Sequence, residues 1–314
     1  MRLLFLFYLV LFISCYNESN EENFNSNDNN HQKLNLLESN YYVSNLKKGD
    51  SLLSGYYNGL INRKIYSDNI NQSISFFKKS LIYASQKDSV IPLNKLGECY
   101  LIIKDYEKAV IFLEKSILID KTNYNSHLLL ANAFSGNSNK LKSINILLTL
   151  IDIDTIEIDD RVECNLLLGH MYAESFDKQC LVYYDNVLDL EKDNVRSLYG
   201  KGLFYQNMQE YSSAVDMYHE IKKYDPFNIN ANFNLGFIFM ELKDYNIAIN
   251  YFSDVIVENN DYYKAFFARG ICYEKKGDIF NAEKDYRTAL NIFPQYQEAR
   301  SRLDTILEDN LKYN

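Results

Sequence analysis

Tryptophan is absent from the 314-residue sequence, and proline and glycine are scarce, with 3 and 11 copies. Because a turn-rich all-β fold needs many turn residues, this scarcity disfavours such folds and favours helices. The sequence also lacks any Lys/Arg-rich run, and its net charge is −9. A nucleic-acid binder needs a basic surface that replaces counterions on phosphates, so we expect no nucleic-acid partner. The same balance argues against a polybasic membrane patch.

Motifs for metal binding and catalysis are missing as well. None of the five cysteines forms a Cys-x-x-Cys pair, so a zinc or thioredoxin-like site has no support. The four histidines are far apart in sequence, and no nucleophile-elbow, Walker, zinc-protease or EF-hand signature occurs. We therefore predict that the protein is not an enzyme and has no catalytic residue, metal or cofactor.

The sequence begins with a short apolar run. Leu3 to Ile13 follows the positively charged Arg2, and it is too short to span a bilayer of about 30 Å as a helix. The stretch Phe12-Ile13-Ser14-Cys15 resembles the bacterial lipobox, although that motif prefers leucine where Phe12 stands. The resemblance implies a lipoprotein signal peptide over residues 1–14 and an acylated Cys15, palmitate being one of the acyl groups expected. An ordinary secretory signal and an uncleaved anchor are the alternatives.

The residues after the cysteine are polar. Residues 16–33 consist mainly of Asn, Glu and Ser, which bury little, and we predict a disordered tether over residues 15–45. A coil of about 18 residues spans roughly 23 Å on average. The folded part would therefore stay near a membrane, on the periplasmic side or at the cell surface. Tyr16 after the cysteine favours the outer membrane in a Gram-negative host.

A 34-residue repeat follows. Gly202, Gly236 and Gly270 are 34 residues apart, and each is followed by an aromatic residue after three positions, by Ala after twelve and by a second aromatic after sixteen. The residues at these offsets are Tyr205, Phe239 and Tyr273; Ala214, Ala248 and Ala282; and Tyr218, Phe252 and Tyr286.

Each copy holds two apolar stretches at helical period around a short polar break, which predicts a pair of helices. Asp105, Asp244 and Asp278 are placed to cap the second helix of their pairs. The repeated glycine in the first helix suggests a close approach of the second helix, because glycine otherwise costs about 1 kcal/mol against alanine there.

This pattern is similar to that of the tetratricopeptide-repeat family. The resemblance implies an all-α, right-handed α-solenoid of about six to seven helix pairs over residues 46–312, with a C-terminal capping helix. The expected copies are a degenerate one at 48–89, opened by Gly55, then 90–123, 124–161, 162–194, 195–228, 229–262 and 263–296, with the cap at 297–312. Residues 151–161 extend the second copy, either as a loop or as a longer helix end.

In this family the first helices line a concave groove that binds a partner. The residues expected to bind a partner there are Arg196, Tyr199, Leu203, Asn230, Phe233, Phe237, Lys264, Phe267 and Ile271. An aromatic strip flanked by cations suits an acidic or carboxylate-bearing peptide with apolar anchors. Packing between first helices is the alternative role for Phe233 and Phe267.

Two functions remain open at this point. The favoured one is a membrane-tethered scaffold or adaptor of the bacterial cell envelope, with a protein or peptide partner in the groove and a lipid anchor in the membrane. The other is an envelope protein that binds a small ligand or a glycan in the Tyr-rich groove.

Overall fold

The computed structural model describes residues 26–58 and 66–313. In these residues the chain forms fifteen α-helices and no β-strand, which confirms the predicted all-α class. The helices divide into two compact units, one ending at Lys121 and the other beginning at Thr122. None of the described helices is both long enough and apolar enough to cross a bilayer.

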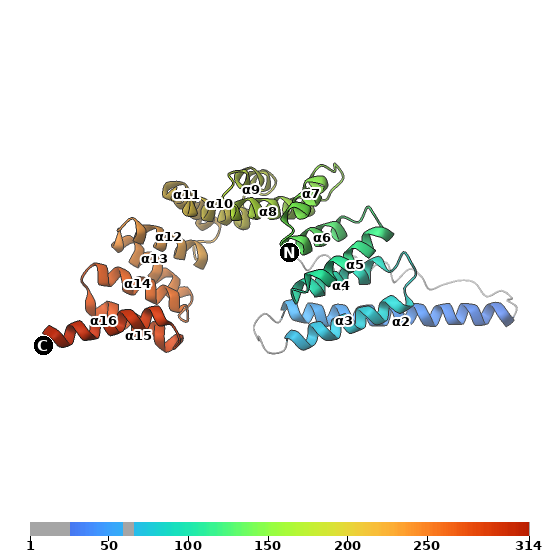
Figure 1. Cartoon of the computed structure of the whole chain (residues 1–314), viewed down its shortest axis with the longest axis horizontal. Coiled ribbons are helices and arrows are strands. Elements are labelled where there is room, and N and C mark those ends of the chain that lie inside the picture. The colour runs from blue at the N-terminus through green and yellow to red at the C-terminus, as the bar shows by residue number, and fades with distance from the viewer. Residues whose placement is uncertain (1–25, 59–65, 314) are drawn as a thin grey trace. The chain divides into compact units, whose positions relative to one another are not determined.

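The N-terminal unit consists of two helix pairs. Its helices are α2 (Ser26–Asn58), α3 (Tyr66–Tyr83), α4 (Val90–Ile102) and α5 (Tyr106–Ile119). Helix α2 runs antiparallel to α3 and extends well beyond it (Figure 1).

The prediction of a disordered tether is wrong for residues 26–45, which belong to α2. Aromatic contacts hold the middle of this helix against the rest of the unit. The ring of Tyr41 stacks on Tyr83 with a centroid distance of 5.4 Å, and the Tyr42 hydroxyl donates a hydrogen bond to the carbonyl oxygen of Asp88 at 3.1 Å. Residues 15–25 of the predicted tether lie outside the described residues.

In the first pair, the glycine that contacts the second helix is Gly49, whereas the sequence pattern predicts Gly55. A Cβ atom built on Gly49 would lie 2.5 Å from Cε1 of Phe77, whereas one built on Gly55 would meet nothing within 4 Å. The same relation holds in the second pair, where a Cβ on Gly97 would lie 2.5 Å from the Leu113 side chain. The hydroxyl of Ser73 strengthens the first contact by donating to the Gly49 carbonyl at 3.1 Å. Ser73 and Phe77 therefore belong to the second helix of this pair, as predicted.

The C-terminal unit consists of five helix pairs and a final helix. First helices are α6 (Tyr124–Gly136), α8 (Ile158–Glu174), α10 (Val195–Asn207), α12 (Ile229–Glu241) and α14 (Tyr263–Lys275). Second helices are α7 (Lys140–Ile151), α9 (Gln179–Leu190), α11 (Tyr211–Tyr224), α13 (Tyr245–Glu258) and α15 (Ile279–Ile292). Helix α16 (Gln297–Tyr313) packs on α15 through Leu303 and Ile306 and closes the array.

The turns inside the six pairs from α4–α5 to α14–α15 follow one pattern. A residue with positive φ ends the first helix, and the next amide donates to a carbonyl five residues back, as Asp244 does to Phe239 at 2.8 Å. In three of these turns the side chain of the residue whose amide donates this bond also caps the second helix. The residues that do so with a carboxylate are Asp105, Asp244 and Asp278, which confirms their predicted role.

The insertion at residues 151–161 forms an anchored loop followed by an early start of α8. Ile156 is buried between α7 and α8, and the Arg161 guanidinium donates to the carbonyl oxygens of Ile151 and Ile153 at 3.1 and 3.0 Å. Helix α8 begins at Ile158, before the start of the third predicted copy. These contacts hold the acidic loop against the array, and the early start lengthens α8 to 17 residues.

Candidate partner-binding surface

The first helices of the C-terminal unit form a layer of their own. Helix α6 contacts α8, α8 contacts α10, and α12 contacts α14. Each second helix packs on its own first helix and on the next one along the chain. Side chains on the free side of the first helices therefore come together on one surface of the unit.

A glycine and a ring set the distance between the two helices of a pair. The glycines Gly202, Gly236 and Gly270 face Tyr218, Phe252 and Tyr286, and a Cβ on any of them would lie 2.7 Å from a ring carbon. All three rings are fully buried. Because the rings cannot move outward, each first helix is fixed in place against its partner.

Three equivalent aromatic residues lie above these rings, and we call them the aromatic row: Tyr199, Phe233 and Phe267. Each is half-buried and packs at a tilt on the buried ring of its own pair, with centroid distances of 5.9, 5.6 and 5.7 Å respectively. Part of each ring is thus used for packing and part remains on the surface. The packing role considered for Phe233 and Phe267 is therefore real, and it leaves part of each ring accessible.

Residues just before the next first helix extend the aromatic row. Phe233 contacts Tyr262 at 5.3 Å and Phe267 contacts Tyr296 at 4.9 Å between centroids. The Asn234 amide donates to the Tyr199 hydroxyl at 3.0 Å. Tyr262 and Tyr296 follow Phe233 and Phe267 at the same spacing in the sequence. This recurrence is visible in the sequence, but it falls outside the offsets counted from the glycines.

The phenol groups of Tyr262 and Tyr296 stay protonated at neutral pH. Burial raises the pKa of Tyr262, with smaller contributions from Tyr199 and Tyr263. Burial also raises the pKa of Tyr296 to about 12, assisted by Glu298 and Tyr263. The surface accordingly offers hydroxyl groups that donate and accept hydrogen bonds, beside apolar rings.

The predicted cations differ in their surroundings. Arg196 forms a two-pronged ion pair with Glu163 of α8, in which Nη2 lies 3.1 Å from Oε2. Lys264 is exposed on α14. Because both partners of the Arg196 pair are partly exposed, the pair adds little stability, and it occupies the guanidinium that was expected to receive a carboxylate.

The remaining predicted residues are spread over the same three first helices. Asn230 is exposed at the start of α12, whereas Leu203 and Phe237 are half-buried. Ile271 is half-buried and packs against the cluster that joins α14, α15 and α16. Cys15, the predicted lipidation site, lies outside the described residues.

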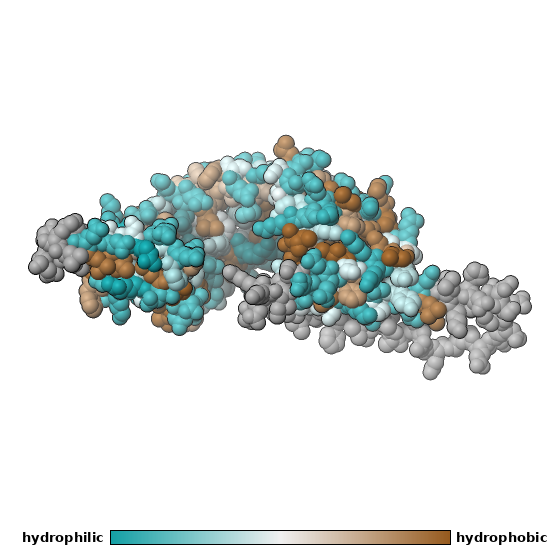
Figure 2. Space-filling view, turned by 60° about the horizontal axis from the view of Figure 1, so that its bottom comes forward, coloured by the Kyte–Doolittle hydropathy of each residue, from teal (hydrophilic) through white to brown (hydrophobic). Residues whose placement is uncertain are grey.

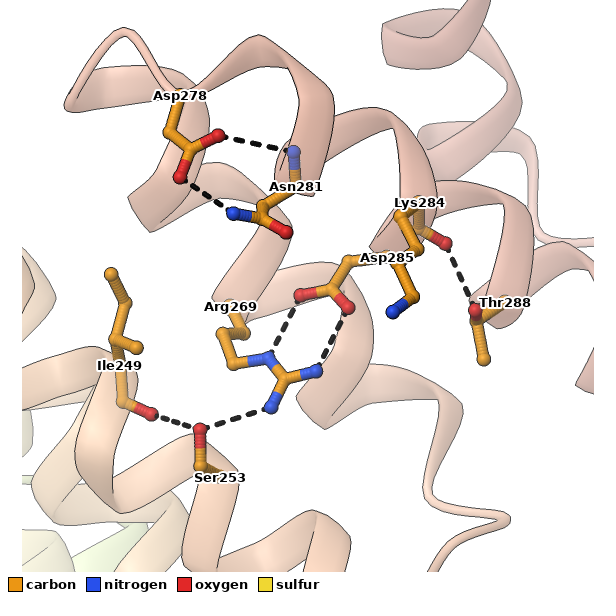
Figure 3. A network of polar contacts seen from close by, with 8 residues as sticks. All are labelled: Ile249, Ser253, Arg269, Asp278, Asn281, Lys284, Asp285 and Thr288. Atoms are coloured by element: carbon orange, nitrogen blue, oxygen red, sulfur yellow. Dashed lines mark hydrogen bonds and ion pairs between the residues drawn. The ribbon is translucent and has the colours of Figure 1, made fainter.

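An ion-pair network holds α14, which carries Phe267 of the aromatic row, against α13 and α15. Arg269 donates to both carboxylate oxygens of Asp285 at 2.8 and 2.9 Å and to the Ser253 hydroxyl at 2.9 Å (Figure 3). Asp285 is buried on α15 and Ser253 lies on α13, so the guanidinium joins three consecutive helices. The network gives Lys264 and Phe267 a rigid support.

The described residues show no arrangement that favours catalysis. No group of three or more His, Cys, Asp or Glu side chains in them is placed to hold a metal ion. A surface cavity of about 630 Å³ lies in the N-terminal unit, lined by Gln86, Lys87, Val90, Ile119 and Asp120. It involves none of the predicted residues and no cluster of titrating groups.

Family comparison identifies the repeats. Models described as "Tetratricopeptide repeat" match residues 92–123, 229–257 and 263–304. A sequence relative is the tetratricopeptide repeat protein 21 homolog of Caenorhabditis elegans, which is 27% identical over 252 residues. That alignment covers 74% of this chain but only 19% of the relative's length. The chain therefore contains tetratricopeptide repeats, and its helices form a tetratricopeptide-repeat solenoid.

Solved structures agree on the fold. A tetratricopeptide repeat protein from Parabacteroides merdae superposes with a TM-score of 0.56 at 12% identity, covering 83% of this chain and 99% of that one. PilW, described as a widely conserved type IV pilus biogenesis factor, superposes with a TM-score of 0.58 at 17% identity, covering 70% and 100%. At these identities the likeness concerns the fold alone.

Proposed function

We propose that this protein is a membrane-tethered scaffold or adaptor of the bacterial cell envelope. Its partner would be a protein or peptide bound on the first-helix surface of α10, α12 and α14. Domains of this repeat type bind protein or peptide partners, and a repeat array offers an extended surface for that purpose. The observation that carries the proposal is the aromatic row, whose rings are anchored from below and partly accessible from above.

The row suits an extended peptide with apolar side chains. Rings that are held by packing lose little entropy on binding, and aromatic anchors dominate the energetics of interfaces. The phenol groups of Tyr262 and Tyr296 offer hydrogen bonds to a peptide backbone. The ammonium group of Lys264 remains available for a carboxylate, whereas Arg196 would first have to leave Glu163. We therefore expect apolar anchors to contribute more affinity than acidic side chains.

Aromatic substitutions test the surface. Phe237→Ala combined with Phe267→Ala should weaken partner binding by about 2–4 kcal/mol, measured as recovery of a stoichiometric partner from envelope extract. Phe280→Ala is the matched control, because Phe280 is 79% exposed on α15, outside the first-helix layer. Intact helicity of the double variant with unchanged recovery would move the site elsewhere. Recovery of a glycan or small ligand instead of a protein would favour the alternative function.

Acylation tests the tether. The proposal rests on the apolar run that ends at Ser14-Cys15, so Cys15→Ala should abolish acylation and release the protein from the membrane. Mass spectrometry of the wild-type N-terminus gives the direct reading. An unmodified Cys15 in a membrane-free mature protein contradicts lipid anchoring while leaving the first-helix surface untouched.

A further inference from the structure

Lysine and aromatic side chains alternate across the N-terminal unit, on a surface that the proposed function does not use. Lys48 of α2 and Lys79 of α3 lie over the ring of Phe76, at 5.7 and 5.3 Å from its centroid. Lys78 of α3 and Lys108 of α5 lie over the ring of Tyr100, at 5.7 and 5.5 Å.

The pattern continues along α5. The ring of Phe112 stacks on Tyr100 at 5.4 Å and nearly parallel, and Lys115 lies 5.7 Å above the ring of Phe112. Lys78 and Lys79 are consecutive residues of α3, so this helix carries one lysine of each group. We call the lysines of the two groups the lysine seam, consisting of Lys48, Lys78, Lys79, Lys108 and Lys115.

All five lysines are exposed. Lys108 forms an ion pair with Asp105 at 2.5 Å. In the described part of the chain no carboxylate pairs with the other four, although Glu114 shares the outer face of α5. The sequence contains no basic run because these lysines come from three separate helices. The absence of a basic run in the sequence therefore does not exclude a cluster of lysines in the folded unit.

Apolar side chains accompany the lysines on the second helices. Ile82 of α3 is 74% exposed, and Ile111 and Leu118 of α5 are 50% and 76% exposed. Figure 2 shows one face of the molecule, on which hydrophobic groups are set among hydrophilic ones. Ammonium groups beside apolar side chains match the boundary between charged lipid headgroups and acyl chains.

Charge is divided unevenly between the two units. Residues 15–121, which remain after the proposed cleavage before Cys15, contain 13 Lys and Arg against 13 Asp and Glu, a net charge of 0. Residues from Thr122 onward contain 19 against 29, a net charge of −10. A negatively charged plane would repel the acidic second unit, whereas the first unit, with no net charge, meets no such repulsion when its lysines face the plane.

We propose that the lysine seam docks the N-terminal unit on an anionic lipid surface. The seam lies in the unit that directly follows the proposed lipid anchor in sequence, and it relies on that anchor only to bring the unit near the membrane. Each lysine near an anionic membrane strengthens binding about fivefold, and the effect falls within a Debye length. The lysine seam belongs to the N-terminal unit and the aromatic row to the C-terminal unit, so the two proposed surfaces share no residue.

Lysine labelling on vesicles tests this proposal. The full chain from a bacterial host is mixed with vesicles of phosphatidylcholine, without or with phosphatidylglycerol, and exposed lysines are modified with an amine-reactive reagent. Labelling of Lys48, Lys78, Lys79 and Lys115 should fall several-fold on the phosphatidylglycerol vesicles only, and high salt should restore it. Lys192 and Lys284, which are exposed in the C-terminal unit, should react equally on both.

A charge-reversal pair completes the test. Lys78→Glu with Lys79→Glu should abolish the protection of Lys48 and Lys115, whereas Lys192→Glu with Lys284→Glu changes the net charge equally and should leave it intact. Equal labelling of the seam on both vesicle types overturns the proposal, as does protection by an acidic protein without lipid. Retention of the chain on plain phosphatidylcholine reports on the N-terminal anchor alone, so the two ideas fail separately.

Discussion

Substitution by alanine at two glycines of α2 should change the free energy of unfolding in opposite directions. Gly49→Ala places a methyl group 2.5 Å from a ring carbon of Phe77, which has no exposed surface. Carbon atoms pack at about 3.5–4.0 Å, so ring and helix must separate by about 1 Å. Overpacking of this kind costs about 1–3 kcal/mol, and alanine returns about 1 kcal/mol of helix propensity.

The net expectation for Gly49→Ala is a loss of about 1 kcal/mol in the free energy of unfolding. Gly55→Ala, further along α2, meets nothing within 4 Å and should gain about 0.5–1 kcal/mol by reducing the freedom of the unfolded chain. Urea unfolding followed by circular dichroism measures both. The two variants should differ by about 2 kcal/mol. This difference does not depend on absolute stability.

A background variant isolates the cause. In Phe77→Ala protein the clash is absent, so Gly49→Ala should become stabilising. The coupling free energy between the two sites should then approach about 2 kcal/mol. If both glycine variants stabilise the wild-type chain alike, the packing of α2 on α3 described above is wrong. If the responses are exchanged, Gly55 is the contact glycine after all.

Two further predictions concern the core. Ala248 is fully buried beside Phe252 and Cys272, so Ala248→Leu should lower the free energy of unfolding by about 1–3 kcal/mol, and an unchanged melting temperature contradicts the assigned register. Burial raises the pKa of the Cys99 and Cys272 thiols to about 12, so above pH 9 the unfolded chain releases protons that the folded chain retains. The free energy of unfolding should therefore fall by up to about 1.4 kcal/mol per pH unit for each such thiol. Urea midpoints measured under reducing conditions between pH 8 and about 11 would show this fall. Midpoints that do not change with pH would contradict the burial of these thiols.

The sequence predicts the C-terminal pairs well because their contacts recur at constant offsets. The offset from Gly236 to Phe252 is the same as the offset between the equivalent residues on either side, and each offset corresponds to one physical contact. The capping aspartates are equally local, since a cap involves a side chain and an amide a few positions away. Local and periodic interactions are the ones that self-comparison detects.

The N-terminal pair escapes the same reasoning. Gly49 and Phe77 are much farther apart in sequence than the other contact pairs, because α2 continues past the contact and a long connection follows it. Counting from Gly55 instead shifts the first helix, and the polar composition of residues 26–40 conceals its length. The lysine seam is hidden for a related reason, since only the fold brings Lys48, Lys79 and Lys115 together.

For the aromatic row, sequence spacing identifies the residues but not which part of each ring packs inside the unit and which part remains accessible. Spacing leaves binding and packing open for Phe233 and Phe267, and the buried rings on which they pack make the two roles compatible. The ion pair of Arg196 with Glu163 depends on neighbouring repeats, which a one-dimensional pattern does not relate.

The turns within the helix pairs leave room for adjustment of single repeats. Lys104, Ser138, Phe176, Gln209 and Lys243 all adopt φ between 54° and 65°, a conformation that only Gly277 among the equivalent residues takes without steric cost. A side chain there costs about 1 kcal/mol or more. Exchange between glycine and a larger residue at one solvent-facing position per turn can therefore change the stability of an individual repeat without altering any residue of the aromatic row. The stability of a repeat and the choice of a partner can thus evolve independently.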